Sequence, residues 1–510
     1  MNFPRASGVL LHPTSLPGAY GIGEIGPQAR AFADALREMG QHLWQVLPIG
    51  STGYADSPYQ SFSTFAGNPL LISFDLLCRE GLLSRSRLAR FPHFPDDQVD
   101  FGPVITARFA VLKTVCRTFE SRSSARKRRA FRSFCRKNAF WLEDFSLFYA
   151  LKTVHGGRPW TEWGPELAQR DPAALREARA RYRGAIRDVK ICQYLFFDQW
   201  TRLVRYGHAR GIRIIGDIPI FVAHDSADVW AHPELFYLDD RGFPTVVAGV
   251  PPDYFSRTGQ LWGNPLYRWD VHRETGYAWW VARMRKMFEL VDIVRIDHFR
   301  GFEAYWEIQG RETTAMNGRW VKGPNASLFK ALHKQLGRLP IIAEDLGVIT
   351  PEVEALRDEF RFPGMRVLQF AFGGDPKATD YRPEQYPKNC VVYTGTHDNN
   401  TTVGWFNSEP GTDTTRTKEQ IEAERRNILD YVKTDGREIH WDLIGVAMRS
   451  SANTAVVPLQ DVMGLGSEAR MNVPGTTGGN WSWRFTWDML APQMKKRLRR
   501  LTHDARRNRP

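Results

Sequence analysis

Residues 292–298 read Asp-Ile-Val-Arg-Ile-Asp-His, a short apolar run that ends in an acidic side chain. Runs of this kind, alternating with amphipathic helical patterns, are typical of a parallel sheet built from β/α units. Seven more occur at 9–12, 43–48, 213–220, 340–345, 366–370, 391–398 and 455–461. Eight such units predict an α/β fold in which the sheet closes into a (β/α)8 TIM barrel.

Helical patterns separate these runs. Ala29, Phe32, Ala33, Leu36 and Met39 recur on one helical face. Thr350-Pro351 offers an N-cap followed by a first-turn proline. The alternative architecture is an open, doubly wound sheet, which normally carries a glycine-rich nucleotide turn after its first strand. We do not expect a turn of this kind in the chain, and the barrel is therefore favoured.

The lengths of the connections predict how the chain is divided. Two stretches, one between the second and third strands and one after the third, exceed ordinary β/α loop length. Both are expected to be insertions near the face formed by the carboxyl ends of the strands. The expected segments are 1–75 (strands one and two), 76–190 (a basic, mainly helical insertion), 191–222 (the third strand and its preceding helix), 223–275 (an aromatic, Pro- and Gly-rich insertion flanking the active site) and 276–510 (strands four to eight and a C-terminal helix).

Positive charge is concentrated in the first insertion. The formal charge of the chain is +13, and residues 76–190 hold 24 Lys and Arg against 12 Asp and Glu. Within this segment, 122–137 interleaves basic residues with Phe131 and Phe134 at helical spacing, which would suit an anionic surface, although we favour a solvated helix face. Because no recognised nucleic-acid-binding motif accompanies the charge, no nucleic-acid partner is expected.

Targeting signals are lacking. The apolar run before His12 and Pro13 is too short for a secretory signal, and no later stretch is long and apolar enough to span a bilayer. The five cysteines are scattered, form no C-x-x-C pair and are typical of reduced thiols. We therefore expect a cytoplasmic protein without membrane contact.

Three of the predicted strands end in carboxylates. Asp297, Glu344 and Asp398 lie at the ends of the fourth, fifth and seventh runs. Active sites of β/α barrels lie at the carboxyl ends of the strands. One acidic residue in such a place more often caps a loop, but three together predict a catalytic site.

Asp297 and Glu344 end neighbouring strands, which lie roughly 4.8 Å apart. Carboxyl groups about 5 to 5.5 Å apart suit double displacement at a sugar carbon with retention, whereas inversion needs roughly 6.5 to 9.5 Å. Arg295 lies two residues before Asp297 and on the same side of the strand, where its guanidinium favours an ionised nucleophile. Glu344 must carry a proton, which requires surroundings that raise its pKa.

Seven blocks of sequence carry a resemblance to a known family. They read RIDHFRGF (295–302), AEDLG (343–347), GTHDN (395–399), GVLLHPTSLPG (8–18), SPYQSFSTFAGNP (57–69), GDIPIFV (216–222) and GNW (479–481). These blocks resemble the amylomaltases, or disproportionating enzymes, which are 4-alpha-glucanotransferases of the alpha-amylase clan. The family often has Asp where this chain has Asn400.

The resemblance implies a role for each residue of the predicted site. Asp297 would be the nucleophile, Glu344 the general acid/base and Asp398 the transition-state stabiliser. Arg295 and His397 would hold the sugar at the cleavage subsite. Because alternation along a strand would put His397 and Asp398 on opposite faces, both reach the sugar only if the strand ends before them.

Asp217 ends the third predicted strand and matches another family block. It is expected to hydrogen-bond near Arg295 or the donor sugar, with a purely structural role as the alternative. The second insertion offers Trp262 for stacking on a sugar, with Asp253 and Asn264 for its hydroxyls. Further candidate substrate contacts are Tyr54, Tyr59 and Asn480, the alternative for the aromatic residues being packing under a loop.

The implied activity is transfer of α-1,4-glucan segments through a covalent glucosyl-enzyme intermediate. An oriented acceptor can reach effective molarities of roughly 10⁵ M, enough to compete with water. A retaining α-glucan hydrolase and a non-catalytic glucan-binding protein are the alternatives, and the three carboxylates argue against the latter. Neither a cofactor nor a metal is expected, the expected partners are α-1,4-glucans such as maltooligosaccharides and amylose, and the sequence specifies no oligomeric state.

Overall fold

A parallel sheet of eight strands forms the centre of the computed structural model, which describes residues 3–252, 257–411 and 416–507. The strands are β1 (Ala6–Leu10), β2 (Leu43–Gln45), β3 (Arg213–Pro219), β6 (Ile293–Asp297), β9 (Ile341–Ala343), β10 (Gly364–Val367), β11 (Cys390–Tyr393) and β12 (Thr454–Pro458). They neighbour one another in chain order, and β12 pairs with β1. A hydrogen bond of 2.9 Å from Ala343 N to Pro363 O joins the remaining pair, β9 and β10. The predicted barrel is therefore confirmed.

Each of the eight predicted runs overlaps a strand of the barrel, although several predicted ends differ from the observed ones by two to five residues. The runs were recognisable because their side chains are buried on both faces: all residues of β1, β11 and β12 are buried. The prediction was wrong at the end of the seventh strand, which was extended to residue 398. β11 ends at Tyr393 because the chain then turns into a loop fastened by side-chain hydrogen bonds.

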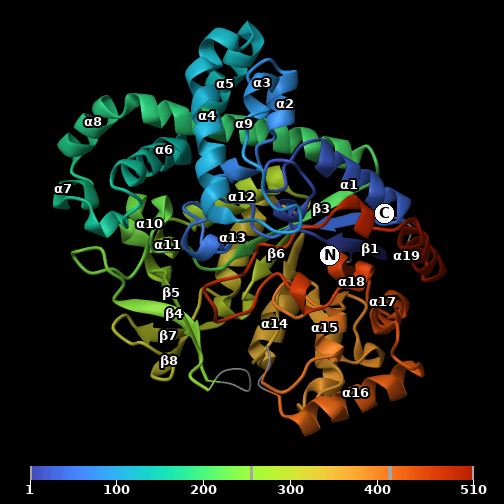
Figure 1. The fold of residues 1–510 in the computed structure, drawn as a ribbon. Helices are drawn as coiled ribbons and strands as arrows, with labels where there is room; N and C mark the ends of the chain where they lie inside the picture. Colours follow the sequence, from blue (N-terminus) through green and yellow to red (C-terminus); the bar gives the residue numbers. More distant parts are fainter. Residues whose placement is uncertain (1–2, 253–256, 412–415, 508–510) are drawn as a thin grey trace.

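Helices surround the barrel strands (Figure 1). They include α1 (Pro27–Glu38), α9 (Arg183–His208), α12 (Ala278–Leu290), α13 (Ala326–Leu336), α14 (Pro351–Glu359), α16 (Lys418–Val432), α17 (Ile439–Arg449) and α19 (Pro492–Asp504). The predicted apolar face of α1 is buried. Thr350 and Pro351 do begin α14, but the threonine side chain makes no capping hydrogen bond. Within the described residues no helix is long and apolar enough to cross a membrane.

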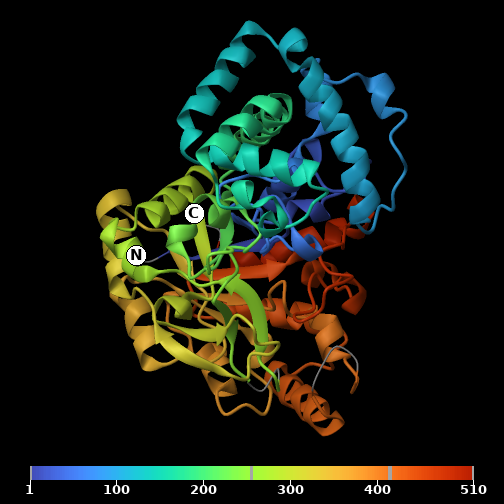
Figure 2. The same ribbon diagram turned by 90° about the vertical axis from the view of Figure 1, so that its left-hand side faces the viewer.

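The segment between β2 and β3 forms a helical lobe on one side of the barrel (Figures 1 and 2). Its helices are α2 (Phe74–Arg79), α3 (Arg85–Leu88), α4 (Phe101–Arg122), α5 (Ala125–Lys137), α6 (Ala139–Val154), α7 (Pro165–Ala168) and α8 (Pro172–Arg181). Helix α9 crosses the boundary expected at residue 190: its first half packs on the lobe and its second half on the barrel. This helix therefore connects the two parts.

The segment after β3 contributes to an antiparallel sheet that the sequence did not predict. Strands β4 (Val246–Val250) and β5 (Gln260–Pro265) pair with β7 (Ala304–Gln309) and β8 (Gly318–Lys322) in the order β5-β4-β7-β8. Two of these strands follow β6, in the part of the chain assigned to the barrel. Pairing between β4 and β7 joins residues about sixty positions apart, such as Ala248 with Glu307, and no local pattern reveals it.

Residues 21–26 (Gly-Ile-Gly-Glu-Ile-Gly) match the spacing G-x-G-x-x-G. The expectation that the chain carries no such glycine-rich pattern is therefore wrong. In the structure these glycines allow close packing of the chain just before α1. A Cβ on Gly23 would lie 1.9 Å from Pro13 O, and one on Gly26 would lie 2.2 Å from Ser73 Oγ. The pattern therefore has a packing explanation within the barrel.

Candidate active site

A buried arginine joins two acidic side chains at the carboxyl ends of β3 and β6. Arg295 lies 2.7 Å from Asp217 Oδ2 through Nη1 and 2.9 Å from Asp297 Oδ1 through Nη2. Alternation along β6 places Arg295 and Asp297 on one side of the strand, as predicted. The hydrogen bond expected between Asp217 and Arg295 is also confirmed. The Arg295 and Asp217 side chains are almost fully buried, whereas 31% of the Asp297 side chain is exposed.

Glu344 follows β9, the neighbour of β6, and two backbone N–H groups hold its carboxyl group. His298 N donates to Oε2 at 2.6 Å, and Leu346 N donates to Oε1 at 2.8 Å. His298 has a left-handed backbone with φ of 54°. The chain therefore turns immediately after Asp297, with the His298 N–H directed at Glu344. This contact brings the end of β6 and the start of the β9 loop together.

The two carboxyl groups have contrasting surroundings. Burial, and then the negative charge of Asp297, raise the pKa of Glu344 to about 8, although Arg295 and the two backbone donors oppose the shift. Glu344 is only 9% exposed. It is therefore protonated at neutral pH, while Asp297 is more exposed and is ion-paired with Arg295. The predicted role of Glu344 as an acid required a raised pKa, but the sequence alone could not show the burial that causes it.

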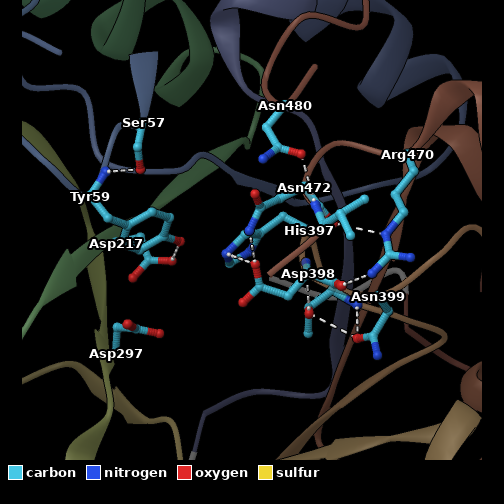
Figure 3. Close-up of polar contacts among 12 residues, drawn as sticks. Ser57, Tyr59, Asp217, Asp297, His397, Asp398, Asn399, Arg470, Asn472 and Asn480 are labelled. Carbon is cyan, nitrogen blue, oxygen red and sulfur yellow. Dashed lines mark hydrogen bonds and ion pairs between the residues drawn. The ribbon is translucent and has the colours of Figure 1, made fainter. Parts of the chain in front are cut away.

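The loop after β11 supplies the opposite side of the site. His397 Nε2 lies 3.4 Å from Asp398 Oδ1, so the two side chains lean together and do not diverge as they would on a strand. Asp461, at the start of α18 (Leu459–Met463), accepts hydrogen bonds from Thr394 Oγ1 and Thr402 N on either side of this loop. In Figure 3, Asp217 and Asp297 lie on one side of the view, and His397 and Asp398 on the other.

Tyr59 connects the two sides. Its hydroxyl donates to Asp217 Oδ2 at 3.0 Å, and its ring stacks on His397 with centroids 5.2 Å apart and an interplanar angle of 16°. Trp481 packs against His397 at 5.9 Å. Burial and the charge of Asp217 raise the Tyr59 pKa far above its usual value, so the phenol stays a hydrogen-bond donor. Tyr59, which was predicted as a further substrate contact, thus lies between the two sides of the site.

Asp398 is held by residues that sequence reasoning missed. Asn472 Nδ2 donates to Asp398 Oδ1 at 2.7 Å, and Arg470 donates to the Asp398 backbone carbonyl at 2.8 Å (Figure 3). These contacts span more than seventy positions in the chain. A lone asparagine in a loop provides no sequence signal for such a contact, although the nearby GNW block, with Asn480, did mark this segment.

The remaining predicted substrate contacts lie in different places. Trp262 packs edge-on against His298 at a centroid distance of 4.8 Å, beside Glu344. Asn264 is 7% exposed and donates to Val222 O, and Asn480 accepts from Val473 N within its own loop. The structure therefore uses both amides to hold loops. Asp253 lies outside the described residues, and Tyr54 is placed by its backbone alone, at the start of a short helix (Tyr54–Asp56).

The described part of the chain contains no group of three side chains arranged to hold a metal ion. At the site itself, Asp217 and Asp297 bind Arg295, and Glu344 binds two backbone donors. Acidic side chains therefore meet around the buried Arg295 at the carboxyl ends of the barrel strands. This arrangement is typical of enzymes built on a β/α barrel.

Known proteins place the chain within this class. A family model described as 4-alpha-glucanotransferase matches residues 11–490. The chain is 52% identical to the 4-alpha-glucanotransferase of Thermus thermophilus, over 99% of this chain and all of the relative, and 48% identical to that of Synechocystis, over 95% of each. The structure of the amylomaltase from Streptococcus agalactiae in complex with acarbose superposes with a TM-score of 0.93 at 39% identity, covering 99% of both chains. The chain belongs to the 4-alpha-glucanotransferase family, and the predicted resemblance is confirmed.

The raised pKa of Glu344 predicts how pH affects stability. The pKa of this carboxyl group is higher in the folded protein than in the unfolded chain. The group therefore contributes stability that is fully present at a pH below the pKa of the unfolded chain. This contribution is lost as the pH rises through the folded value of about 8. Glu344→Gln carries no titrating proton. The apparent melting temperature of the variant relative to wild type should therefore increase between about pH 4.5 and 8.

Thermal unfolding followed by circular dichroism at several pH values measures this difference. The NH2 group of the glutamine must face one of the two backbone N–H donors. This contact lowers the stability of the variant by about the same amount at every pH. The test is therefore how the difference in melting temperature changes with pH, and not its size at one pH. Glu354→Gln, at an exposed position of α14, is the matched control and should show no trend. A flat difference for Glu344→Gln would contradict the raised pKa.

Proposed function

We propose that the chain transfers α-1,4-glucan segments from a donor glucan to another glucan or glucose by double displacement with retention. One observation carries this proposal: neighbouring strands present an ion-paired aspartate and a buried glutamic acid with a raised pKa. Double displacement needs a carboxylate nucleophile beside a carboxylic acid. The ion pair of Asp297 and the raised pKa of Glu344 support these two roles.

In the first displacement, Asp297 would attack the anomeric carbon of the donor. The glycosidic bond breaks as the new ester forms, and Glu344 gives its proton to the departing 4-oxygen. Arg295, which contacts Asp217 and Asp297 together, holds the nucleophile in place. The products are a shortened glucan and a glucosyl ester on Asp297.

In the second displacement, Glu344 has become a carboxylate and takes the proton of an acceptor 4-hydroxyl. That oxygen attacks the anomeric carbon and releases Asp297, so two inversions give net retention. Asp398 and His397 lie across from Asp297 (Figure 3). Asp398 would stabilise the positive charge that develops on the sugar ring in both transition states.

Transfer would prevail over hydrolysis because an acceptor is bound and oriented. Trp262 lies beside His298, next to the acid/base, and offers an aromatic surface for a sugar. An oriented hydroxyl can reach an effective molarity of roughly 10⁵ M, far above that of water. A retaining α-glucan hydrolase remains the second candidate, because it would use the same carboxylates.

A cytoplasmic location is part of the proposal. The five cysteines are scattered along the chain and form no C-x-x-C pair, a pattern typical of reduced thiols in the cytoplasm.

Incubation with maltotriose tests the activity. The wild type should give a ladder of longer and shorter glucans while the number of reducing ends stays constant. Glu344→Gln should lower turnover by roughly 100- to 10,000-fold, because an amide cannot protonate the leaving oxygen, and should still bind glucan. A steady rise in reducing ends would instead identify a hydrolase, and near-normal turnover by the variant would remove Glu344 from the proposed role.

Asn472 tests the role of Asp398. Asn472→Ala removes the hydrogen bond to Asp398 Oδ1 and should lower kcat roughly 10- to 100-fold with little change in KM, because the carboxylate loses its orientation. Asn472→Asp should lower kcat further, since a like charge would lie beside Asp398. Steady-state kinetics with maltotriose measure both variants. If the alanine variant kept the wild-type kcat, the positioning of Asp398 by Asn472 would be excluded.

A further inference from the structure

A hollow lies in the helical lobe, where α5 packs beside the first half of α9. Ring contacts join the two helices, with Phe131 and Tyr194 at a centroid distance of 5.7 Å and Phe134 and Phe197 at 5.4 Å. Figure 1 shows α5 at the outer end of the lobe, away from the barrel strands. This α5–α9 groove has a volume of about 400 Å³ and is lined by Phe131, Arg132, Cys135, Arg136, Arg183, Ile186, Arg187 and Lys190.

The groove is formed by one face of each helix. Its lining residues on α9 are spaced three, four and seven positions from the first, and those on α5 fall on two successive turns. Phe131 and Ile186 are buried and contribute apolar surface to its floor. Five cationic side chains from the two helices surround this floor.

Most of this charge is not neutralised by the protein. Arg187 lies 3.2 Å from Glu120 and Lys190 lies 2.6 Å from Glu143, and both contacts are partly exposed. Arg132, Arg136 and Arg183 are exposed, and they form no salt bridge with any residue that the structure describes. A solvated helix face would explain cations that point apart into solvent. In this groove, however, the cations come from two helices and line one hollow that has an apolar floor.

The lining indicates which ligand would fit. Guanidinium groups form paired hydrogen bonds with phosphate oxygens, which makes arginine the preferred residue for phosphate recognition. The apolar floor would suit a planar or apolar body attached to that phosphate. A free phosphate would leave the floor uncovered, and an uncharged aromatic would leave the arginines without a partner.

We propose that the α5–α9 groove binds an organic phosphate of the nucleotide class, with its base on the apolar floor and its phosphates between the arginines of the two helices. This site is separate from the carboxylates of the barrel. It does not rest on the function proposed for them.

Calorimetric titration with ATP tests the proposal. We expect saturable binding to one site per chain, with inorganic triphosphate and adenosine each binding more weakly. The double substitution Arg132→Glu and Arg136→Glu should weaken ATP binding at least about tenfold, because two charge-assisted contacts become repulsions. The matched control is Arg126→Glu with Arg129→Glu, which makes the same charge change at exposed positions of α5 outside the groove and should leave the affinity within about twofold.

Both double variants should retain wild-type transfer activity, which shows that they fold. Equal weakening by the two would mean that ATP senses only the overall charge of α5, and would overturn the proposal. Triphosphate binding as tightly as ATP would overturn the part assigned to the apolar floor. Preference for an oligonucleotide over ATP would point to a nucleic-acid surface instead.

Cys135 provides an independent position-specific test, because its thiol lines the groove. Bound ATP should slow its modification by a thiol reagent, as followed by mass spectrometry of the intact and digested protein. Cys78, on α2 and also half-buried, is the internal reference and should react at an unchanged rate. Equal rates at Cys135 with and without saturating ATP would place the ligand elsewhere and contradict the proposal.

Discussion

The buried guanidinium of Arg295 is the interaction on which the site depends. It contacts Asp217 and Asp297 together while its own side chain is almost fully removed from solvent. Taking a cation and carboxylates out of water is costly unless they pair with good geometry. Without Arg295, Asp297 would lie as an uncompensated charge near Glu344. With it, an ionised carboxylate can stand beside a protonated one.

The barrel makes this arrangement possible because adjacent parallel strands deliver their ends to the same place. Register between β3 and β6 sets Asp217 opposite Arg295, and β9 brings Glu344 beside the turn at His298. Tyr59 then joins this side to the loop that carries His397 and Asp398. Each group proposed to act in catalysis is therefore held by a neighbour on a different strand or loop. Such rigid positioning is what reacting atoms require.

Most of the barrel could be predicted from the sequence because its strands are buried runs, as in β11 and β12. Asp297 and Glu344 could be predicted because they end such runs. The sheet of β4, β5, β7 and β8 could not, since its pairing is long-range and its strands are short. Asn472 was missed for the same reason: its contact with Asp398 depends on how two distant loops meet. The burial that raises the pKa of Glu344 is likewise a property of the assembled fold.

Trapping of the covalent intermediate tests the central claim most directly. A fluorinated α-glucosyl fluoride slows breakdown of the glucosyl ester, so the intermediate should accumulate in the absence of an acceptor. Mass spectrometry of the digested protein should then find one glucosyl adduct per chain on the peptide that contains Asp297, with the bond on that side chain. An adduct on Glu344 or Asp398, or complete turnover of the reagent by Asp297→Asn, would contradict the account.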